Sequence, residues 1–147
     1  MTDVESFFSE DDKKQILDAI REAEHRTSGE IRVHLENSCK IDVLDRAAYI
    51  FEKLKMHQTK LRNGVLFYLA VKDRKFAILG DAGINRVVAD DFWDQIKENM
   101  LNEFKEERFA QGLTTGISMT GKALRKFFPY QSDDVNELPD DISFGSK

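Results

Sequence analysis

Residues 62–84, which read RNGVLFYLAVKDRKFAILGDAGI, decide the fold. Every residue from 64 to 71 is apolar or glycine, a polar turn follows at 72–75, and residues 76–79 are apolar again. Short apolar runs bounded by turn chemistry are typical of strands that are covered on both faces, and a polar break this tight is typical of a hairpin. The stretch therefore predicts the central antiparallel pair of a sheet, flanked by loops that can carry chemistry.

The segments before the hairpin predict a strand and a helix. Apolar and polar side chains alternate over residues 31–36, which indicates a half-exposed strand near a sheet edge and gives His34 an exposed position. Residues 43–54 carry apolar side chains at helical spacing after Asp42, a residue that often caps helices. A strand, helix and strand of these lengths indicate a right-handed crossover, so the first two strands should be parallel and the sheet mixed.

Three further helices are predicted around these segments. The first starts after Ser9 and ends near residue 27, the second starts at about Asp91, and the third spans about 109–128, where Pro129 ends it. The third helix contains three glycines: Gly112, Gly116 and Gly121. Each glycine costs roughly 1 kcal/mol of helix stability relative to alanine, so we expect a compensating close approach of this helix to the sheet.

The composition is that of one ordinary globular domain. The chain has 147 residues, of which 41% are hydrophobic and 33% charged, and its net charge is −5. Five acids and one base lie after Pro129, so this segment carries −4 and the remaining body only −1. A nearly neutral body argues against a nucleic-acid surface, which needs a basic face. The single cysteine, Cys39, excludes an internal disulfide and a cysteine-rich zinc site.

We expect residues 1–128 to form the domain and residues 129–147 to be an acidic, mobile tail, in which Leu138, Ile142 and Phe144 are the positions that could dock. The first residues lack the basic region and apolar core of a signal peptide. The longest apolar run has eight residues, far below the roughly 18 that a membrane span requires. A soluble, cytoplasmic chain is the expectation.

The order and spacing of several short segments resemble those of the TPM domain, a family named for a plant thylakoid lumen protein, a photosystem II repair protein and a nematode receptor modulator. The similarity covers about residues 9–128. Segments 57–66 and 80–84 resemble a soluble bacterial branch of the family. The segments that carry it are 27–33 (TSGEIRV), 57–66 (HQTKLRNGVL), 73–75 (DRK), 80–84 (GDAGI), 87–91 (VVADD) and 109–113 (FAQGL).

This resemblance implies a three-layer α/β/α sandwich around a mixed sheet of about four strands, one more than the residues themselves indicate. It also implies an acid phosphatase activity, with an acidic pocket that can hold Ca²⁺ or Mg²⁺. The chain departs from the family pattern at two acidic positions, where it has Arg62-Asn63 and Asn85, whereas Asp90 matches. Fewer carboxylates weaken a site for hard cations. The family is usually secreted or membrane-anchored, whereas we expect neither device in this chain.

The candidate metal ligands are Asp81, Asp90 and Asp91. Asp81 directly follows a predicted strand in a glycine-flanked loop, so it could be a metal ligand or a general acid/base, although aspartate also serves simple turn chemistry there. Asp90 and Asp91 could complete an acidic cluster, but capping of the next helix explains them better. A bound cation would be Ca²⁺ or Mg²⁺.

The candidate ligand-binding residues are Arg62, Asn63 and Thr59, with His57 as a second candidate acid/base. Arg62 could bind an anion such as a phosphate, or it could form an ion pair with Asp81 that holds two loops together and replaces a lost cation. His57 could act near the same loops, although a histidine in the last turn of a helix more often interacts with the helix dipole. Both pairs of alternatives stay open at the level of sequence.

The sequence thus favours a TPM-like domain that acts mainly through protein contacts within a membrane-associated bacterial complex. The resemblance suggests a LemA-type membrane protein as partner. The alternative is a metal-assisted phosphomonoesterase, with Asp81 and Asp90 as ligands and Arg62 on the phosphate.

Overall fold

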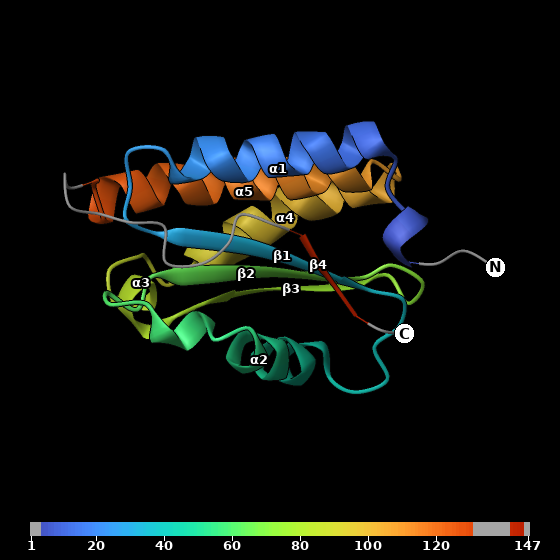
Figure 1. Ribbon diagram of the computed structural model, residues 1–147, viewed down its shortest axis with the longest axis horizontal. Coiled ribbons are helices and arrows are strands. Elements are labelled where there is room, and N and C mark those ends of the chain that lie inside the picture. The colour runs from blue at the N-terminus through green and yellow to red at the C-terminus, as the bar shows by residue number, and fades with distance from the viewer. Residues whose placement is uncertain (1–3, 131–141, 146–147) are drawn as a thin grey trace.

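The computed structural model describes residues 4–130 and 142–145, and Figure 1 shows how its elements are arranged. A short 3₁₀ turn, η1, precedes the first long helix, and a second, η2, precedes the second strand. The elements in chain order are η1 (Val4–Ser6), α1 (Glu10–Glu24), β1 (Glu30–Glu36), α2 (Val43–Lys53), η2 (Met56–Gln58), β2 (Gly64–Ala70), β3 (Lys75–Gly80), α3 (Ala82–Asn85), α4 (Phe92–Lys105), α5 (Phe109–Phe127) and β4 (Ile142–Phe144).

The four strands form one mixed sheet in the order β3-β2-β1-β4. β1 and β2 are parallel, so the helix between them forms the predicted crossover. β2 and β3 form the predicted hairpin, with Val65 opposite Gly80 and Ala70 opposite Lys75. β4 pairs with β1 in parallel, with Ile142 opposite Val33. The mixed four-stranded sheet is therefore confirmed, and its fourth strand comes from the segment expected to be a tail.

Helices cover both faces of the sheet, as the α/β/α prediction requires (Figure 1). One face packs on α1, α4 and α5 and contributes alternate strand residues such as Val33 and Phe67 to the larger core cluster. The other face packs on α2, where Leu66 and Tyr68 join a smaller cluster. Because successive side chains of a strand point to opposite faces, the continuous apolar run of β2 supplies both cores.

Two positions within the sheet differ from the prediction. β1 was expected near an edge, but it lies between β2 and β4, and His34 and Glu36 on its polar face are buried. The alternation was misleading because these polar side chains bind each other rather than water. β3 was expected in the centre with β2, but it forms the open edge of the sheet.

The glycines of α5 do permit close packing, but mostly against helices rather than the sheet. A Cβ at Gly121 would lie 2.6 Å from the Cβ of Ala23 in α1, and a Cβ at Gly112 would lie 2.3 Å from the ring of Phe104 in α4. At Gly116 it would meet Met100 of α4 at 2.5 Å and Phe67 of β2 at 3.0 Å. The glycines therefore set the distance between α5 and its two neighbours.

In the acidic C-terminal segment, Ile142 is buried and Phe144 packs against the larger core, so two of the three expected docking positions do dock. Leu138 and the expected mobility of residues 131–141 lie outside the described residues. In the described part of the chain, no helix combines the length and the apolarity that a membrane span requires.

Candidate functional site

An ion pair joins the two loops at one end of the β2–β3 hairpin. Arg62 precedes β2 and Asp81 follows β3, so the antiparallel pairing brings them together. The Nε of Arg62 donates to Oδ2 of Asp81 at 2.7 Å, and Nη2 donates to Oδ1 at 2.8 Å. These hydrogen bonds and the charge of Asp81 raise the pKa of Arg62. Of the two alternatives for Arg62, the ion pair is present in the structure.

Asp81 is buried, whereas the side chain of Arg62 is half exposed. Asp81 is also the N-cap of the short helix α3, and its Oδ1 accepts from the N–H of Ala82 at 2.8 Å. Both carboxylate oxygens are therefore engaged by this chain. An arginine whose guanidinium is hydrogen-bonded along one edge to a buried carboxylate keeps a fixed orientation.

The backbone of the two loops is in direct contact. Gly83 N–H donates to the carbonyl of Arg62 at 2.8 Å, and a Cβ at Gly83 would lie 2.1 Å from the carbonyl oxygen of Leu61. Only glycine allows this approach. Arg62 itself has φ of 53°, a left-handed conformation that non-glycine residues rarely adopt and that is common at binding sites.

A cleft of about 480 Å³ opens beside the ion pair, between α2 and the end of β3. Three of the predicted site residues converge on it: His57, Arg62 and Asp81. Its full lining is Ala48, Phe51, Glu52, His57, Arg62, Leu79, Gly80 and Asp81. The cleft thus combines an apolar wall with one oriented arginine, one histidine and two carboxylates, of which Asp81 is bound to the arginine.

Two nitrogen atoms at this cleft have no protein partner within the described residues. The Nη1 of Arg62 makes no hydrogen bond, because Asp81 takes only the edge formed by Nε and Nη2. The Nδ1 of half-buried His57 is enclosed and unpaired. The guanidinium therefore presents its Nη1–Nη2 edge as a two-donor fork for an anion.

Thr59 and Asn63 do not line the cleft and instead brace the loop behind it. Both are buried, and the hydroxyl oxygen of Thr59 accepts from the N–H of Asn63 at 3.2 Å. The Nδ2 of Asn63 donates to the hydroxyl of Ser28 at 3.3 Å, which links the loop to the start of β1. Ligand contact by these two residues remains a prediction.

Asp90 and Asp91 also lie apart from the cleft lining. Asp91 occupies the N-cap position of α4, but its side chain makes no capping hydrogen bond and instead accepts from Nε2 of Gln95 at 2.7 Å. Both oxygens of Asp81 accept hydrogen bonds from Arg62, so a cation at Asp81 would have to displace this arginine, and metal binding by the three aspartates remains a prediction. Within the described residues, no group of three or more His, Cys, Asp or Glu side chains is arranged to hold a metal.

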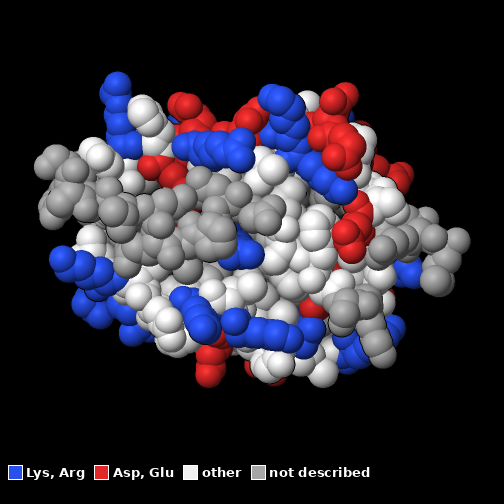
Figure 2. Space-filling view, viewed as in Figure 1, with Lys and Arg blue, Asp and Glu red and all other residues white. Residues whose placement is uncertain are grey.

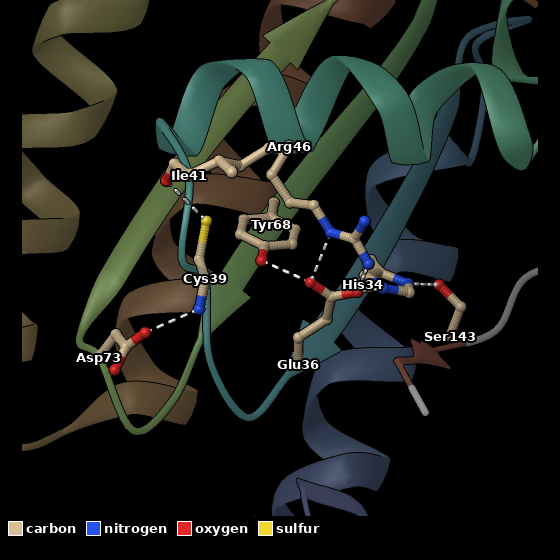
Figure 3. Close-up of polar contacts among 8 residues, drawn as sticks. All are labelled: His34, Glu36, Cys39, Ile41, Arg46, Tyr68, Asp73 and Ser143. Atoms are coloured by element: carbon tan, nitrogen blue, oxygen red, sulfur yellow. Dashed lines mark hydrogen bonds and ion pairs between the residues drawn. The ribbon is translucent and has the colours of Figure 1, made fainter. Parts of the chain in front are cut away.

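A second polar cluster, which the sequence analysis missed, is buried on the α2 side of β1 (Figure 3). Its centre is Glu36, only 3% exposed. Glu36 accepts from the hydroxyl of Tyr68 at 2.6 Å, from Nε and Nη2 of Arg46 at 2.9 and 2.6 Å, and it pairs with Nε2 of His34 at 3.1 Å. We call these four residues the Glu36 cluster.

Burial and hydrogen bonding have opposite effects on the pKa of Glu36 in the Glu36 cluster. Burial alone would raise the pKa of Glu36, but hydrogen bonds from Arg46, Tyr68 and His34 outweigh it and lower this pKa to about 2. Burial lowers the pKa of His34, against the opposite influence of Glu36. Burial and the neighbouring carboxylate raise the pKa of Tyr68. At neutral pH the cluster therefore contains an ionised Glu36, a neutral His34 and a neutral Tyr68.

The Glu36 cluster also holds β4. Ionised Glu36 only accepts hydrogen bonds, so Nε2 of neutral His34 donates to it and Nδ1 is left to accept from the hydroxyl of Ser143, 2.7 Å away. A Cβ at Gly145 would lie 2.5 Å from Cγ of Glu36, so this glycine packs directly on the carboxylate side chain. The cluster thus connects α2, β1, β2 and β4, which indicates a structural role.

The charge distribution is strongly asymmetric. Residues 37–79, which include α2 and the β2–β3 hairpin, contain nine Lys and Arg against four Asp and Glu, a formal +5, so the rest of the chain carries −10. Figure 2 shows Lys and Arg along the lower side of the molecule, where Figure 1 places α2, and Asp and Glu mixed with bases along the upper side, over α1. The candidate cleft is lined in part by α2, on this side, although its own lining holds two carboxylates besides Arg62.

The family model of the TPM domain matches residues 1–123. The chain belongs to the TPM domain family. Among solved structures, this TPM domain is similar to the BA42 protein of the psychrophilic bacterium Bizionia argentinensis, with 54% identity and a TM-score of 0.90 over 99% of this chain and 100% of that chain. No curated protein matches the sequence.

Two more distant structures share the fold of this TPM domain. The N-terminal domain of the cg2496 protein of Corynebacterium glutamicum has 16% identity and a TM-score of 0.68, covering 92% of this chain and 84% of that chain. An N-terminal domain of a P. gingivalis protein has 18% identity and a TM-score of 0.71, covering 88% and 85%. At such low identity these two similarities concern the fold alone.

Proposed function

We propose that this TPM domain is a binding module that recognises an anionic group of a protein partner at the cleft beside Arg62. The observation that carries the proposal is the orientation of the guanidinium. Buried Asp81 accepts hydrogen bonds from the Nε–Nη2 edge of the guanidinium. The Nη1–Nη2 edge has no second partner among the described residues, and Arg62 lines a cleft with an apolar wall. A pre-oriented arginine loses little entropy when it binds a carboxylate or phosphate, which favours recognition.

The basic α2 side of the molecule supports an anionic partner, because opposite charge accelerates association and selects the orientation of docking. We extend the proposal to a membrane-associated bacterial complex. It is supported by the bacterial origin of the similar structures and by the family resemblance, which suggests a LemA-type membrane protein as the partner.

Affinity capture from the native cell tests this function. The bait is the wild-type chain, Arg62→Gln, or Lys122→Gln, a matched loss of one charge from an exposed position of α5. We expect a partner that is retained by wild type and Lys122→Gln and lost with Arg62→Gln. Equal retention by all three baits would contradict binding at this cleft.

The alternative function is a divalent-metal-assisted phosphomonoesterase, as the name of the matching model, TPM phosphatase, suggests. This function requires Asp81 to release Arg62 and to bind the metal ion instead. Turnover of an aryl phosphate that depends on added Mg²⁺ or Ca²⁺ and disappears in Asp81→Asn would favour this alternative. A thermal-shift titration with the same cations gives an independent measure, because a ligand that binds the folded state raises the melting temperature.

A further inference from the structure

The open edge of the sheet lies directly beside the cleft. The N–H of Asp81 donates to the carbonyl of Gly64 at 2.9 Å. Because residues of an antiparallel strand alternate between facing the partner strand and facing away, Ile78 and Gly80 direct their N–H and C=O groups to the outer side of β3. Nδ2 of Asn85 donates to the carbonyl of Gly80. In the described part of the chain, no strand pairs with this edge.

The cleft forms a groove between α2 and this edge strand. Ala48 and Phe51 of α2 and Leu79 of β3 form its apolar lining, and Leu79 packs against the smaller core cluster that includes Phe51. The groove ends at Arg62, just beyond the end of β3. A helix, an adjacent open strand and a cation at the end are the elements that bind the last residues of an extended peptide by strand addition.

We propose that this groove binds the C-terminal residues of an extended segment of the partner, which adds as a strand to the outer edge of β3. The terminal carboxylate lies on the Nη1–Nη2 edge of Arg62, and the last side chain, an apolar one, lies among Ala48, Phe51 and Leu79. This inference rests on the proposed function, because it specifies what the Arg62 cleft recognises.

The direction of the added strand follows from the geometry. β3 runs from Lys75 to Gly80 and ends beside Arg62, so a peptide whose own end lies at Arg62 runs parallel to β3. In this direction its main chain meets the outward groups of Ile78 and the N–H of Gly80. Main-chain pairing supplies affinity without sequence preference, whereas the apolar lining and Arg62 select the terminal residue.

Several features favour a terminal carboxylate over a phosphate monoester. A carboxylate is planar and has two oxygens that match the two parallel donors of a guanidinium edge. The apolar lining next to that edge would be unused by a bare phosphate. Exposed Glu52 also lines the groove and its charge opposes an anion, so an anion bound there must pair directly with Arg62.

The test is a titration of ¹⁵N-labelled full chain, followed by NMR, with two pools of synthetic hexapeptides. Both pools have mixed residues at the first five positions and Leu, Val or Phe at the last. One pool ends in a free carboxylate and the other in a carboxamide. We expect the acid pool to shift the amide signals of Ile78 and Gly80 and the Nε signal of Arg62, and the amide pool to bind at least about tenfold more weakly, because it loses the charge-assisted pair.

Variants distinguish binding in the groove from non-specific electrostatic attraction of the peptide to the protein. Arg62→Gln should abolish the difference between the pools, and Arg62→Lys, which keeps the charge but loses the fork, should reduce it. Lys122→Gln should leave it unchanged. Glu52→Gln, which removes a rim charge, should tighten binding of the acid pool. The same spectra show whether each variant is folded, and Arg62→Lys and Glu52→Gln keep the test decisive if Arg62→Gln does not fold.

Equal shifts with both pools, or no shift with millimolar acid pool, would overturn the proposal. Shifts at the Arg62 signal with phenyl phosphate but not with the acid pool would also overturn it, in favour of a small-molecule phosphate site. If the peptides fail while capture of a partner still depends on Arg62, strand addition is wrong and the proposed function stands. If capture does not depend on Arg62, the proposed function itself is wrong.

Discussion

Glu36 is a single residue on which four elements depend. Its carboxylate is buried and bound by Arg46, Tyr68 and His34. Removing the charge of a buried, hydrogen-bonded ion pair leaves its partner uncompensated, which typically costs about 3–5 kcal/mol. We expect Glu36→Gln to lower the free energy of unfolding in urea at pH 7 by roughly 3 kcal/mol. This value is the lower end of the range, because the side chain of Arg46 is one-third exposed.

Lys14→Gln is the matched control for this prediction, because Lys14 forms an exposed pair with Asp18 at 2.9 Å. Exposed pairs contribute about 0–1 kcal/mol, so this change should be nearly silent. Equal effects of the two substitutions would show that the Glu36 cluster does not hold the fold together.

The same cluster predicts the pH dependence of stability. The pKa of Glu36 is lowered from 4.5 to about 2, so the unfolded chain takes up this proton first, and the stabilisation present above pH 4.5 is lost as the pH falls towards 2. The pKa of His34 is lowered from 6.5, so its contribution also decreases as the pH falls below 6.5. Urea unfolding across this range should show a continuous decrease. In His34→Gln, the free energy of unfolding should decrease less as the pH falls below 6.5. An unchanged decrease in that variant would contradict the contribution assigned to His34.

At the residue scale, sequence reasoning named three residues that line the cleft, His57, Arg62 and Asp81, but not the Glu36 cluster. Arg62 and Asp81 flank one predicted hairpin, so their proximity follows from the hairpin alone. The members of the Glu36 cluster come from β1, α2 and β2, and Ser143 joins from β4. Their meeting depends on side-chain orientation between α2 and three strands of the sheet, which no local pattern contains.

At the scale of elements, α5 depends on glycine where its neighbours come closest. Gly→Ala in a helix normally stabilises by about 1 kcal/mol. At Gly121 the added Cβ would lie 2.8 Å from the backbone Cα of Ala23, which cannot move aside alone, whereas at Gly116 it meets the flexible side chain of Met100. We expect Gly121→Ala to lower stability by about 1–3 kcal/mol and Gly116→Ala to cost clearly less. Thermal melts of the two variants test this order, and stabilisation by Gly121→Ala would contradict the close helix contact.

β4 contributes to stability although it has only three residues. Ile142 is 5% exposed and belongs to the larger core cluster. Truncation of a buried isoleucine to alanine typically costs about 2–5 kcal/mol, and we expect the lower end for a terminal strand. Urea unfolding of Ile142→Ala measures this cost. A change below about 0.5 kcal/mol, the range of surface substitutions, would show that β4 does not dock in solution.

The elements differ in how far their sequence defines them. The long helices have periodic patterns and the hairpin has two apolar runs around a polar turn, so these elements were predicted. β4 has three residues after an acidic segment, too few for any alternation, so only the family resemblance indicated a fourth strand. The alternating pattern of β1 correctly predicted a strand but gave the wrong position in the sheet, because the same pattern describes an exposed face and a buried polar one.

At the scale of the whole molecule, two ends of the sheet differ in character. The end that holds Arg62 and Asp81 has an open cleft lined in part by α2, whereas the Glu36 cluster is enclosed by α2 and β4. The sequence contains the basic stretch 37–79, but only the fold shows that α2 and the hairpin place it on one side of the molecule. The fold thus separates a surface for recognition from a buried cluster that stabilises it.

The central claim is that Asp81 holds Arg62 in one orientation and leaves one edge of its guanidinium free. The most direct measurement is the NMR signal of the Arg62 Nε–H group in wild type and in Asp81→Asn. We predict a resolved, slowly exchanging signal in wild type that moves to the position of a free arginine in the variant, because the charged hydrogen bond is lost. A wild-type signal already at the free-arginine position, unchanged in Asp81→Asn, would contradict the account.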